Sequence, residues 1–301
     1  MKKGIRFLGL LIIILLVSGI VLVGIGWNMV GWQGMSQMVS EVSKGKISFE
    51  DGVIITEEYF VKFEDVLKKN AIFHLKENDM FTDGEEVWKG DVKKTKVASL
   101  SVEDWSLELG GCEFIVKPSE DESYYAEYKG EGKTQVYSRG DELFVKVLNS
   151  RGIDLEKEEN CFTLYVPKDA ELDKVKIELG AGKAVAANIR ANEMEISLGA
   201  GELVLEDSRF QKVELEVGAG RCVIYGEVTD DIKAECAMGS VELKLNGEEE
   251  DFDYDIETVS GSITVGSREY SGLAKEKNIG NDANKKMELE CAMGSIEVRF
   301  E

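Results

Sequence analysis

Three consecutive rows decide the fold of this chain: VKIELGAGKAVAAN at 175–188, MEISLGAGELVLED at 194–207 and VELEVGAGRCVIYG at 213–226. Their matching residues Ile177, Ile196 and Leu215 are 19 positions apart each time. Self-similarity at a fixed period near 20 residues is typical of proteins built by stacking one structural unit. The rows therefore predict a repeat architecture, and the rest of the chain is interpreted around them.

Further copies of the pattern lie on both sides of these rows. AECAMGSVELKL follows with Ala234 in the matching position, then IETVSGSITVGS with Ile256 and LECAMGSIEVRF with Leu289. An earlier copy, LELGGCEFIVK, has Leu107 there. The steps to Ala234, Ile256 and Leu289 are 19, 22 and 33 residues, which indicates insertions before the last two copies. We count seven copies in all.

Each copy alternates apolar and polar residues before and after a turn of small residues. Because successive strand residues face opposite sides, one set is predicted to be interior. The interior columns include Ile177, Leu179, Ile196, Leu198, Leu215, Val217, Cys236 and Cys291. The column that follows the matching residue is the opposite, with Glu108, Glu178, Ser197, Glu216, Glu235, Glu257 and Glu290. These glutamates are expected to point to water.

The turn of each copy carries a glycine, at Gly182, Gly201, Gly220, Gly239, Gly261 and Gly294. Glycine there permits a positive φ or a close approach of two backbones. One 19-residue unit cannot bury its own apolar face, whereas stacked units can. We therefore predict an all-β fold, a β-solenoid or β-helix-like stack of 19-residue coils separated by roughly 4.8 Å. The alternative is a β-sandwich whose hairpins look alike.

The G-A-G and A-M-G-S turns, with the segment CFTLYVPKDAELDKVKIELGAG at Cys161–Gly182, resemble the bacterial putative-adhesin family. That family consists of β-strand-repeat domains of unknown function. The resemblance covers Lys96–Glu301. It implies a surface location and adhesion, and it supplies no catalytic residues.

The N-terminus has the pattern of a membrane anchor. Residues 1–6 carry Lys2, Lys3 and Arg6, and 7–30 is apolar apart from Ser18 and Asn28. A run of this length can span a bilayer as a helix, and the basic flank favours a cytoplasmic N-terminus. The alternative is a cleaved signal peptide. We expect a cytoplasmic tail at 1–6, a transmembrane signal anchor at 7–32, a linker at 33–95 and the β-solenoid adhesin-like domain at 96–301.

The linker is expected to hold one short amphipathic helix over Thr56–Asn70 that packs on the domain or caps its end. Between Leu107 and Val175, three strand triplets begin at Tyr124, Leu143 and Phe162 and keep the 19-residue spacing. Their second halves lose the pattern, so irregular coils and plain hairpins both remain open. A separate apolar column, Ile115, Val185, Val204 and Val223, lies on the nominally outer side and predicts a covered face.

Charge and cysteine usage narrow the partners. The net charge of −22 disfavours nucleic acid and anionic lipid headgroups. Five cysteines without a C-x-x-C motif do not support a zinc or redox site. Cys236 and Cys291 share a column with Thr258 between them, which predicts a separation of about 9–10 Å, too far for a disulfide. Whether Cys112 pairs with Cys161 is left open.

Nothing in the sequence assembles a catalytic, metal or cofactor site. His74 is the only histidine, and the calcium nonapeptide of other β-rolls is missing. Arg139-Gly140-Asp141 matches an adhesion tripeptide but is also ordinary hairpin turn chemistry. The leading hypothesis is a non-catalytic, membrane-anchored extracellular scaffold or binding module with a protein or glycan partner. The alternatives are an envelope accessory or sensor protein that binds a membrane partner, and, less favoured, a polysaccharide-active enzyme.

Overall fold

The computed structural model of the protein describes residues 47–50, 53–56, 60–62, 86–99, 102–148 and 160–301. These belong to two compact units, Met1–Ala71 and Ile72–Glu301. The tail and anchor expected at 1–6 and 7–32, and His74, lie outside the described residues. Across the part of the chain that is described, no helix is long and apolar enough to cross a membrane.

The first unit contains a three-stranded antiparallel sheet, β1 (Ile47–Glu50), β2 (Val53–Thr56) and β3 (Phe60–Lys62). The helix expected over Thr56–Asn70 is therefore wrong in its first part, because Thr56 ends β2 and Phe60 begins β3. β-branched and aromatic residues favour strands, and β2 supplies a pairing partner directly upstream. The helix was predicted from the spacing of the apolar residues alone, without regard to that pairing.

The second unit is all-β, as the repeat predicts, and contains one 3₁₀ turn, η1 (Glu249–Asp251), among its described residues. Its strands are β4 (Val87–Lys89), β5 (Val92–Ser99), β6 (Asp104–Pro118), β7 (Ser123–Lys129), β8 (Lys133–Arg139), β9 (Glu142–Leu148), β10 (Cys161–Val166), β11 (Leu172–Ala187), β12 (Arg190–Leu198), β13 (Glu202–Val217), β14 (Arg221–Val228), β15 (Ile232–Cys236), β16 (Ser240–Leu245), β17 (Phe252–Thr258), β18 (Ser262–Val265), β19 (Arg268–Ser271), β20 (Lys275–Ile279), β21 (Lys285–Cys291) and β22 (Ser295–Phe300). The sheet thus begins at β4, inside the segment 33–95 that was expected as a linker.

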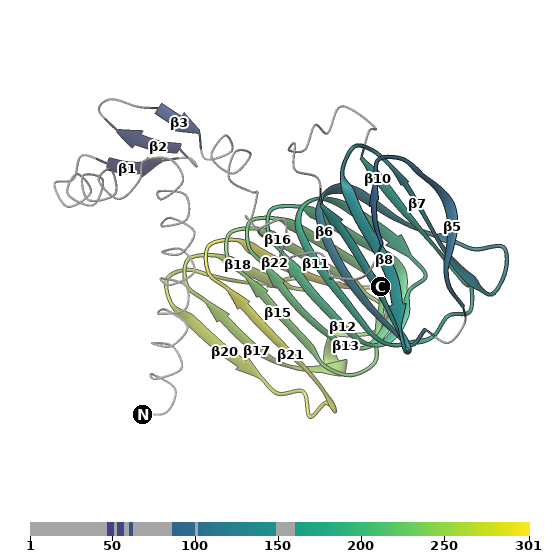
Figure 1. Cartoon of the computed structure of the whole chain (residues 1–301). Helices are drawn as coiled ribbons and strands as arrows, with labels where there is room; N and C mark the ends of the chain where they lie inside the picture. Colours follow the sequence, from purple (N-terminus) through teal and green to yellow (C-terminus); the bar gives the residue numbers. More distant parts are fainter. Residues whose placement is uncertain (1–46, 51–52, 57–59, 63–85, 100–101, 149–159) are drawn as a thin grey trace. The chain divides into compact units, whose positions relative to one another are not determined.

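The coils of this unit stack in parallel and in register, which gives the solenoid-like fold that the repeat predicts (Figure 1). Ile177 pairs with Ile196, and Ile196 pairs with Leu215. Each coil crosses the stack twice, once before its turn and once after it. We call these crossings the first layer and the second layer. The long strands β6, β11 and β13 bend from one layer into the other and so join both into one sheet.

The interior between the layers is a single apolar cluster. Ile177 and Ile196 are each 2 % exposed, and Leu215 is fully buried. The partners of this cluster on the other layer include Leu203 and Ile263, which are also buried. Each such side chain contributes roughly 1.5–3 kcal/mol to folding through its removal from water. The stack is therefore held together by the columns that the alternation of the repeat predicts.

The turn glycines are required mainly by the closeness of neighbouring coils. A Cβ on Gly239 would lie 2.1 Å from the carbonyl oxygen of Gly220 in the coil beside it, far inside van der Waals contact. Of the six turn glycines, Gly182 alone combines this crowding with a positive φ, +119°. Close approach of backbones, rather than left-handed conformation, explains why the turns are glycine.

The C-terminal coils do not stack in chain order. β21 lies between β15 and β17, and β22 lies between β16 and β18. The chain therefore skips one position after β16, builds β17 and β18, turns back through the antiparallel strands β19 and β20, and fills the skipped position last. We call the coil formed by β21 and β22 the return coil.

At the N-terminal end, too, the chain skips one position in the stack and fills it later. β6 lies next to β11, while β9 and β10 fill the position between β6 and the strands β8 and β7. β4 pairs with β8 and β5 pairs with β7 outside them. The segment that could be coils or hairpins is thus both: β9 and β10 form a parallel coil on β6, whereas β7 and β8 run antiparallel to it.

Candidate functional site: the outer faces of the two layers

The outer face of the second layer carries an aliphatic row. Ile115, Val185 and Val204 occupy neighbouring strands in register and are partly exposed. Val223 continues the row but is 1 % exposed. Glu242, Glu297 and Thr264 take over on the following strands. The row is therefore aliphatic on β6, β11, β13 and β14, and it is polar on the strands that follow toward the C-terminal end.

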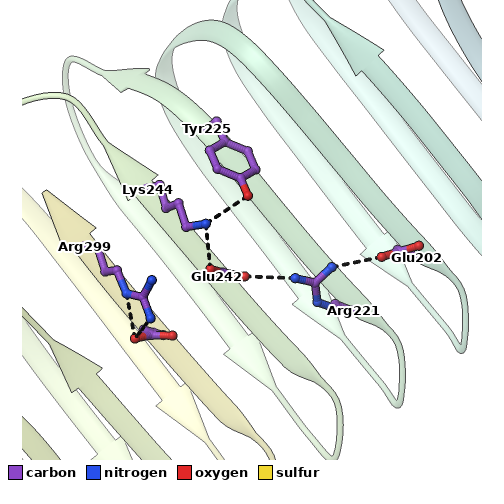
Figure 2. Close-up of polar contacts among 7 residues, drawn as sticks. Glu202, Arg221, Tyr225, Glu242, Lys244 and Arg299 are labelled. Carbon is purple, nitrogen blue, oxygen red and sulfur yellow. Dashed lines mark hydrogen bonds and ion pairs between the residues drawn. The ribbon is translucent and has the colours of Figure 1, made fainter. Parts of the chain in front are cut away.

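Figure 2 shows a network of ion pairs on the strands around this point. One of its members, Glu242, pairs in register with Val223. Arg221 donates hydrogen bonds to Glu202 at 2.9 Å and to Glu242 at 3.0 Å. Lys244 bonds the other oxygen of Glu242 and donates to the hydroxyl of Tyr225, both at 2.9 Å. Because Arg221 and Tyr225 flank Val223 on its own strand, these contacts account for its burial.

The positive charges of Arg221 and Lys244 balance the negative charges of Glu202 and Glu242. The hydrogen bond from Lys244, helped by the positive charges of Lys244 and Arg221, lowers the pKa of Glu242. The hydrogen bond to Glu202 raises the pKa of Arg221. Next to them, Arg299 pairs with Glu297 at 2.6 Å. The ion pairs therefore favour the charged forms of Glu242 and Arg221, and they tie neighbouring strands into a rigid surface.

The outer face of the first layer carries the glutamate column. Glu216, Glu235, Glu290 and Glu257 lie on successive strands in register. Burial, followed by the charges of Glu235 and Glu257, raises the pKa of Glu290 to about 7. A simple solvated face was expected here. Glu290 departs from this expectation because it is partly buried on the return coil, with Glu235 and Glu257 on the two neighbouring strands.

A shallow hollow of about 250 Å³ lies on the same face. Its charged lining comes from Glu193, Glu195, Lys212, Glu214, Asp231, Lys233, Lys286 and Glu288. Lys233 bonds Glu235 at 2.6 Å and lies 3.6 Å from Glu214, so basic and acidic groups alternate. Within the described residues, no three His, Cys, Asp or Glu side chains are grouped so that they could hold a metal ion.

The cysteines are placed differently from the expectation. Cys236 and Cys291 are direct partners on β15 and β21, and Thr258 lies beyond Cys291 on β17. The prediction that Thr258 separates them is wrong, because it assumed that coils stack in chain order. All five cysteines are free thiols. Cys161 pairs with Glu113 rather than with Cys112, so the two thiols face opposite sides of their strands.

Within the Arg139-Gly140-Asp141 tripeptide, Arg139 ends β8, and Gly140 and Asp141 form the two-residue turn before β9. Arg139 pairs with Glu142 across the hairpin, and Gly140 has a φ of +67°. The turn chemistry expected from the sequence accounts for these residues.

One signal in the sequence identifies the neighbour of the return coil. The copies at Ala234 and Leu289 share the letters E-C-A-M-G-S and resemble each other more than either resembles the copy at Ile256. In the structure they are adjacent, and Ala234 pairs with Leu289. Similarity between copies, rather than their order in the chain, therefore points to contact.

The strand architecture agrees with a family model, Toastrack DUF4097, that matches residues 102–269. The chain belongs to the Toastrack DUF4097 family. The matched range begins just before β6 and ends inside β19, so the return coil lies beyond it. No curated protein gives a significant match to the chain.

Solved structures similar to this Toastrack chain include a putative cell adhesion protein from Clostridium sporogenes, with 11 % identity and a TM-score of 0.40 over 72 % of this chain and 100 % of that one. A putative adhesin from Bacteroides fragilis has 12 % identity and a TM-score of 0.32, covering 71 % and 97 %. A putative lipid binding protein from Parabacteroides distasonis has 10 % identity and a TM-score of 0.27, covering 72 % and 97 %. The family membership rests on the family model, and the fold rests on the strand pairings.

Proposed function

We propose that this Toastrack chain is a non-catalytic binding module, held at the outside of a cell membrane by its N-terminal segment, and that its partner is a protein. The basic residues 1–6 and the apolar run 7–32 support the anchor and its orientation. When membranes are washed at alkaline pH, the full chain should stay in the membrane fraction, and a chain without residues 1–32 should not. Recovery of the full chain in the soluble fraction would contradict the anchor.

The observation that carries the proposal is the aliphatic row on the second layer. Ile115, Val185 and Val204 leave apolar surface partly exposed on a rigid, regular face. The ion pairs from Lys183 to Glu202, at 3.4 Å, and from Arg221 to Glu202 border this row. An apolar centre with a polar rim is the common composition of protein interfaces.

A photo-crosslinking amino acid at position 204 of the full chain, in the cells that make it, tests the proposal. Thr264 lies in the same row toward the other end and serves as the matched control. We expect a protein adduct from position 204 and none from position 264. Val185→Glu should abolish the adduct while the folded chain persists. Adducts of equal yield from both positions, a glycan adduct, or no adduct from position 204 would contradict the assignment.

Enzymatic activity is tested separately. The full chain, incubated with cell-wall glycans and peptides, should release no product above a control without protein. Turnover that is saturable and lost after a defined substitution on either outer face would overturn the non-catalytic assignment.

A second function, as an envelope accessory protein that binds a membrane partner through residues 34–95, is favoured by one observation. The strands β1, β2 and β3 of that segment form their own sheet in a separate unit. Because β4 and β5 belong to the large sheet, a deletion of residues 34–71 is the cleaner test. Loss of every crosslinked partner on this deletion, with position 204 intact, would favour the second function.

A further inference from the structure

The return coil brings two thiols together. Cys236 lies within residues 102–269, which the family model matches, and Cys291 lies beyond them. Cys236 on β15 and Cys291 on β21 are in-register partners on parallel strands. Neighbouring strands are about 4.8 Å apart, which lies inside the range of Cα separations that a disulfide spans. Both side chains face the interior and are nearly buried, at 3 % and 2 % exposure.

The turn glycines make room for both sulfur atoms. The Sγ of Cys236 lies 2.8 Å from the position that a Cβ on Gly294 would take, so it leans toward the return coil. The Sγ of Cys291 lies 2.5 Å from the corresponding position on Gly261, in the coil formed by β17 and β18. A side chain larger than glycine at position 294 would displace the Cys236 sulfur from the coil that carries Cys291.

We propose that Cys236 and Cys291 form a disulfide that locks the return coil into the stack. The bond would lie at the point where the stacking order departs from the order of the chain. β21 and β22 are the last strands of the chain and occupy the position that was skipped after β16. A covalent bond between β15 and β21 would prevent the return coil from leaving and exposing the edges of its neighbours. The bond would close a loop containing residues 237–290.

The reaction is a thiol–disulfide exchange with a small-molecule disulfide such as oxidised glutathione. The exchange takes place before the return coil is seated in the stack, because the two thiols are only 3 % and 2 % exposed once it is in place. Cys291, on the unseated return coil, loses its proton. Its thiolate attacks one sulfur of the external disulfide and releases one thiolate. Cys236 then loses its proton and attacks the Cys291 sulfur of the mixed disulfide, releasing the second thiolate. Two protein thiols are oxidised, and one external disulfide is reduced to two thiols.

Formation of the bond in cells rests on the proposed outer location, because a reducing cytoplasm keeps thiols free. The pairing itself does not rest on it. Cys112 and Cys161 provide an internal control, since they are close in space but face opposite sides of their strands. Cys222 has neither of these partners beside it, because its neighbours in register are Leu203 and Val241.

The test uses the full chain purified in detergent under reducing conditions. It is then incubated with oxidised glutathione in mild denaturant, so that the return coil opens transiently and both thiols can react. Afterwards it is fully denatured, alkylated and digested for mass spectrometry. We expect alkylation to fall from five thiols to three, with one cross-linked peptide pair containing Cys236 and Cys291. Cys112→Ser should still form the pair. Persistence of five free thiols, or a pair that includes Cys112, Cys161 or Cys222, would overturn the proposal.

Thermal unfolding supplies a second readout that does not depend on peptide recovery. The oxidised chain should unfold at least ~5 °C above the reduced chain, because the bond restricts the unfolded state. The variant with Cys236→Ala and Cys291→Ala should show no difference between the two conditions. Equal midpoints for the oxidised and reduced wild-type chain would contradict the lock. If the pair forms in the test tube but both thiols are free in cells, the pairing stands and the proposed outer location fails.

Discussion

The two ends of the stack close the same interior with different side chains. At the N-terminal end the space is filled by rings: Trp105 packs edge-on against Tyr124 at 6.2 Å, and Phe114 stacks on Phe162 at 5.7 Å. Around the return coil at the C-terminal end, the column beside the turn instead holds small side chains, Cys236, Cys291 and Thr258. Rings lie farther from the turn there, where Phe252 contacts Tyr254 and Phe300. The N-terminal end is therefore filled by rings, whereas the turn side of the return coil is closed by the close approach of backbones. Removal of volume should damage the first, and addition of volume should damage the second.

The largest expected effect is the loss of a ring at the N-terminal end. Trp105 is 2 % exposed and pairs in register with Leu143 and Val175 on the two neighbouring strands. Trp105→Ala should lower the free energy of unfolding by about 3–5 kcal/mol, because it removes buried surface and leaves a cavity. Denaturant unfolding monitored by circular dichroism checks this. A loss below 1 kcal/mol would show that the rings are not what fills this end.

Added volume at the return coil should have the next largest effect. A Cβ on Gly294 would lie 2.2 Å from the carbonyl oxygen of Gly239. Gly294→Ala should therefore cost roughly 2–4 kcal/mol through overpacking and backbone shifts. The matched change at the N-terminal end is Gly110→Ala, where the nearest atom is the Val147 carbonyl oxygen at 3.2 Å. Equal losses from the two variants in denaturant unfolding would contradict the contrast between the ends.

The pH dependence of stability reports the position of Glu290. Its pKa is about 7 in the folded chain, above its ordinary value of 4.5. The folded chain therefore binds more protons than the unfolded chain between these values, so the free energy of unfolding falls as pH rises through this window. Glu290→Gln should stabilise the chain at pH 8 by about 1–2 kcal/mol relative to wild type, and by much less at pH 5.

Glu216→Gln is the control for the pH experiment. Glu216 belongs to the same column but is exposed and does not lie beside the return coil. Thermal unfolding of both variants from pH 5 to pH 8 separates the effect of the glutamate neighbours from general charge reduction. A Glu290→Gln advantage that is independent of pH would contradict the crowded placement of this carboxyl group.

The smallest effect on stability is expected at the outermost strands, where solubility should change instead. In the described part of the chain, β5 and β20 each pair on one side only, and both present exposed lysines, Lys94 and Lys96 at one end and Lys275 and Lys277 at the other. Lysines on edge strands oppose edge-to-edge pairing, and like charges at both ends oppose end-to-end association. Lys275→Val with Lys277→Val should promote oligomers in sizing chromatography, with a stability change within ~0.5 kcal/mol.

The columns of the central coils could be predicted from the sequence because burial repeats every 19 residues. Ile177, Ile196 and Leu215 therefore pair as the periodicity requires. The stacking order could not be predicted from periodicity, because any coil with apolar columns can pack on any other. Cys291 was placed beyond Thr258 for this reason, and Glu290 was expected on an ordinary solvated face.

The ends were less predictable than the middle. The edge strand β5 has the sequence VKKTKVAS, in which lysines occupy positions where an alternating pattern would need apolar residues. β3 was missed because Phe60 fits the apolar face of the helix expected over Thr56–Asn70 as well as it fits a strand. The ion-pair network around Val223 depends on the diagonal neighbours Arg221 and Glu242, which a search along one strand does not reveal.

The position of the return coil is tested most directly by engineered cross-links on the outer face of the second layer, in a chain whose own cysteines are replaced by alanine. Glu242 pairs with Glu297, and Glu297 pairs with Thr264, so Glu242 and Thr264 are two strands apart. Glu242→Cys with Glu297→Cys should form a disulfide on mild oxidation. Glu242→Cys with Thr264→Cys should not, because strands two apart are separated by about 9–10 Å. A cross-link in the second pair and none in the first would show that the coils stack in chain order and would contradict the account.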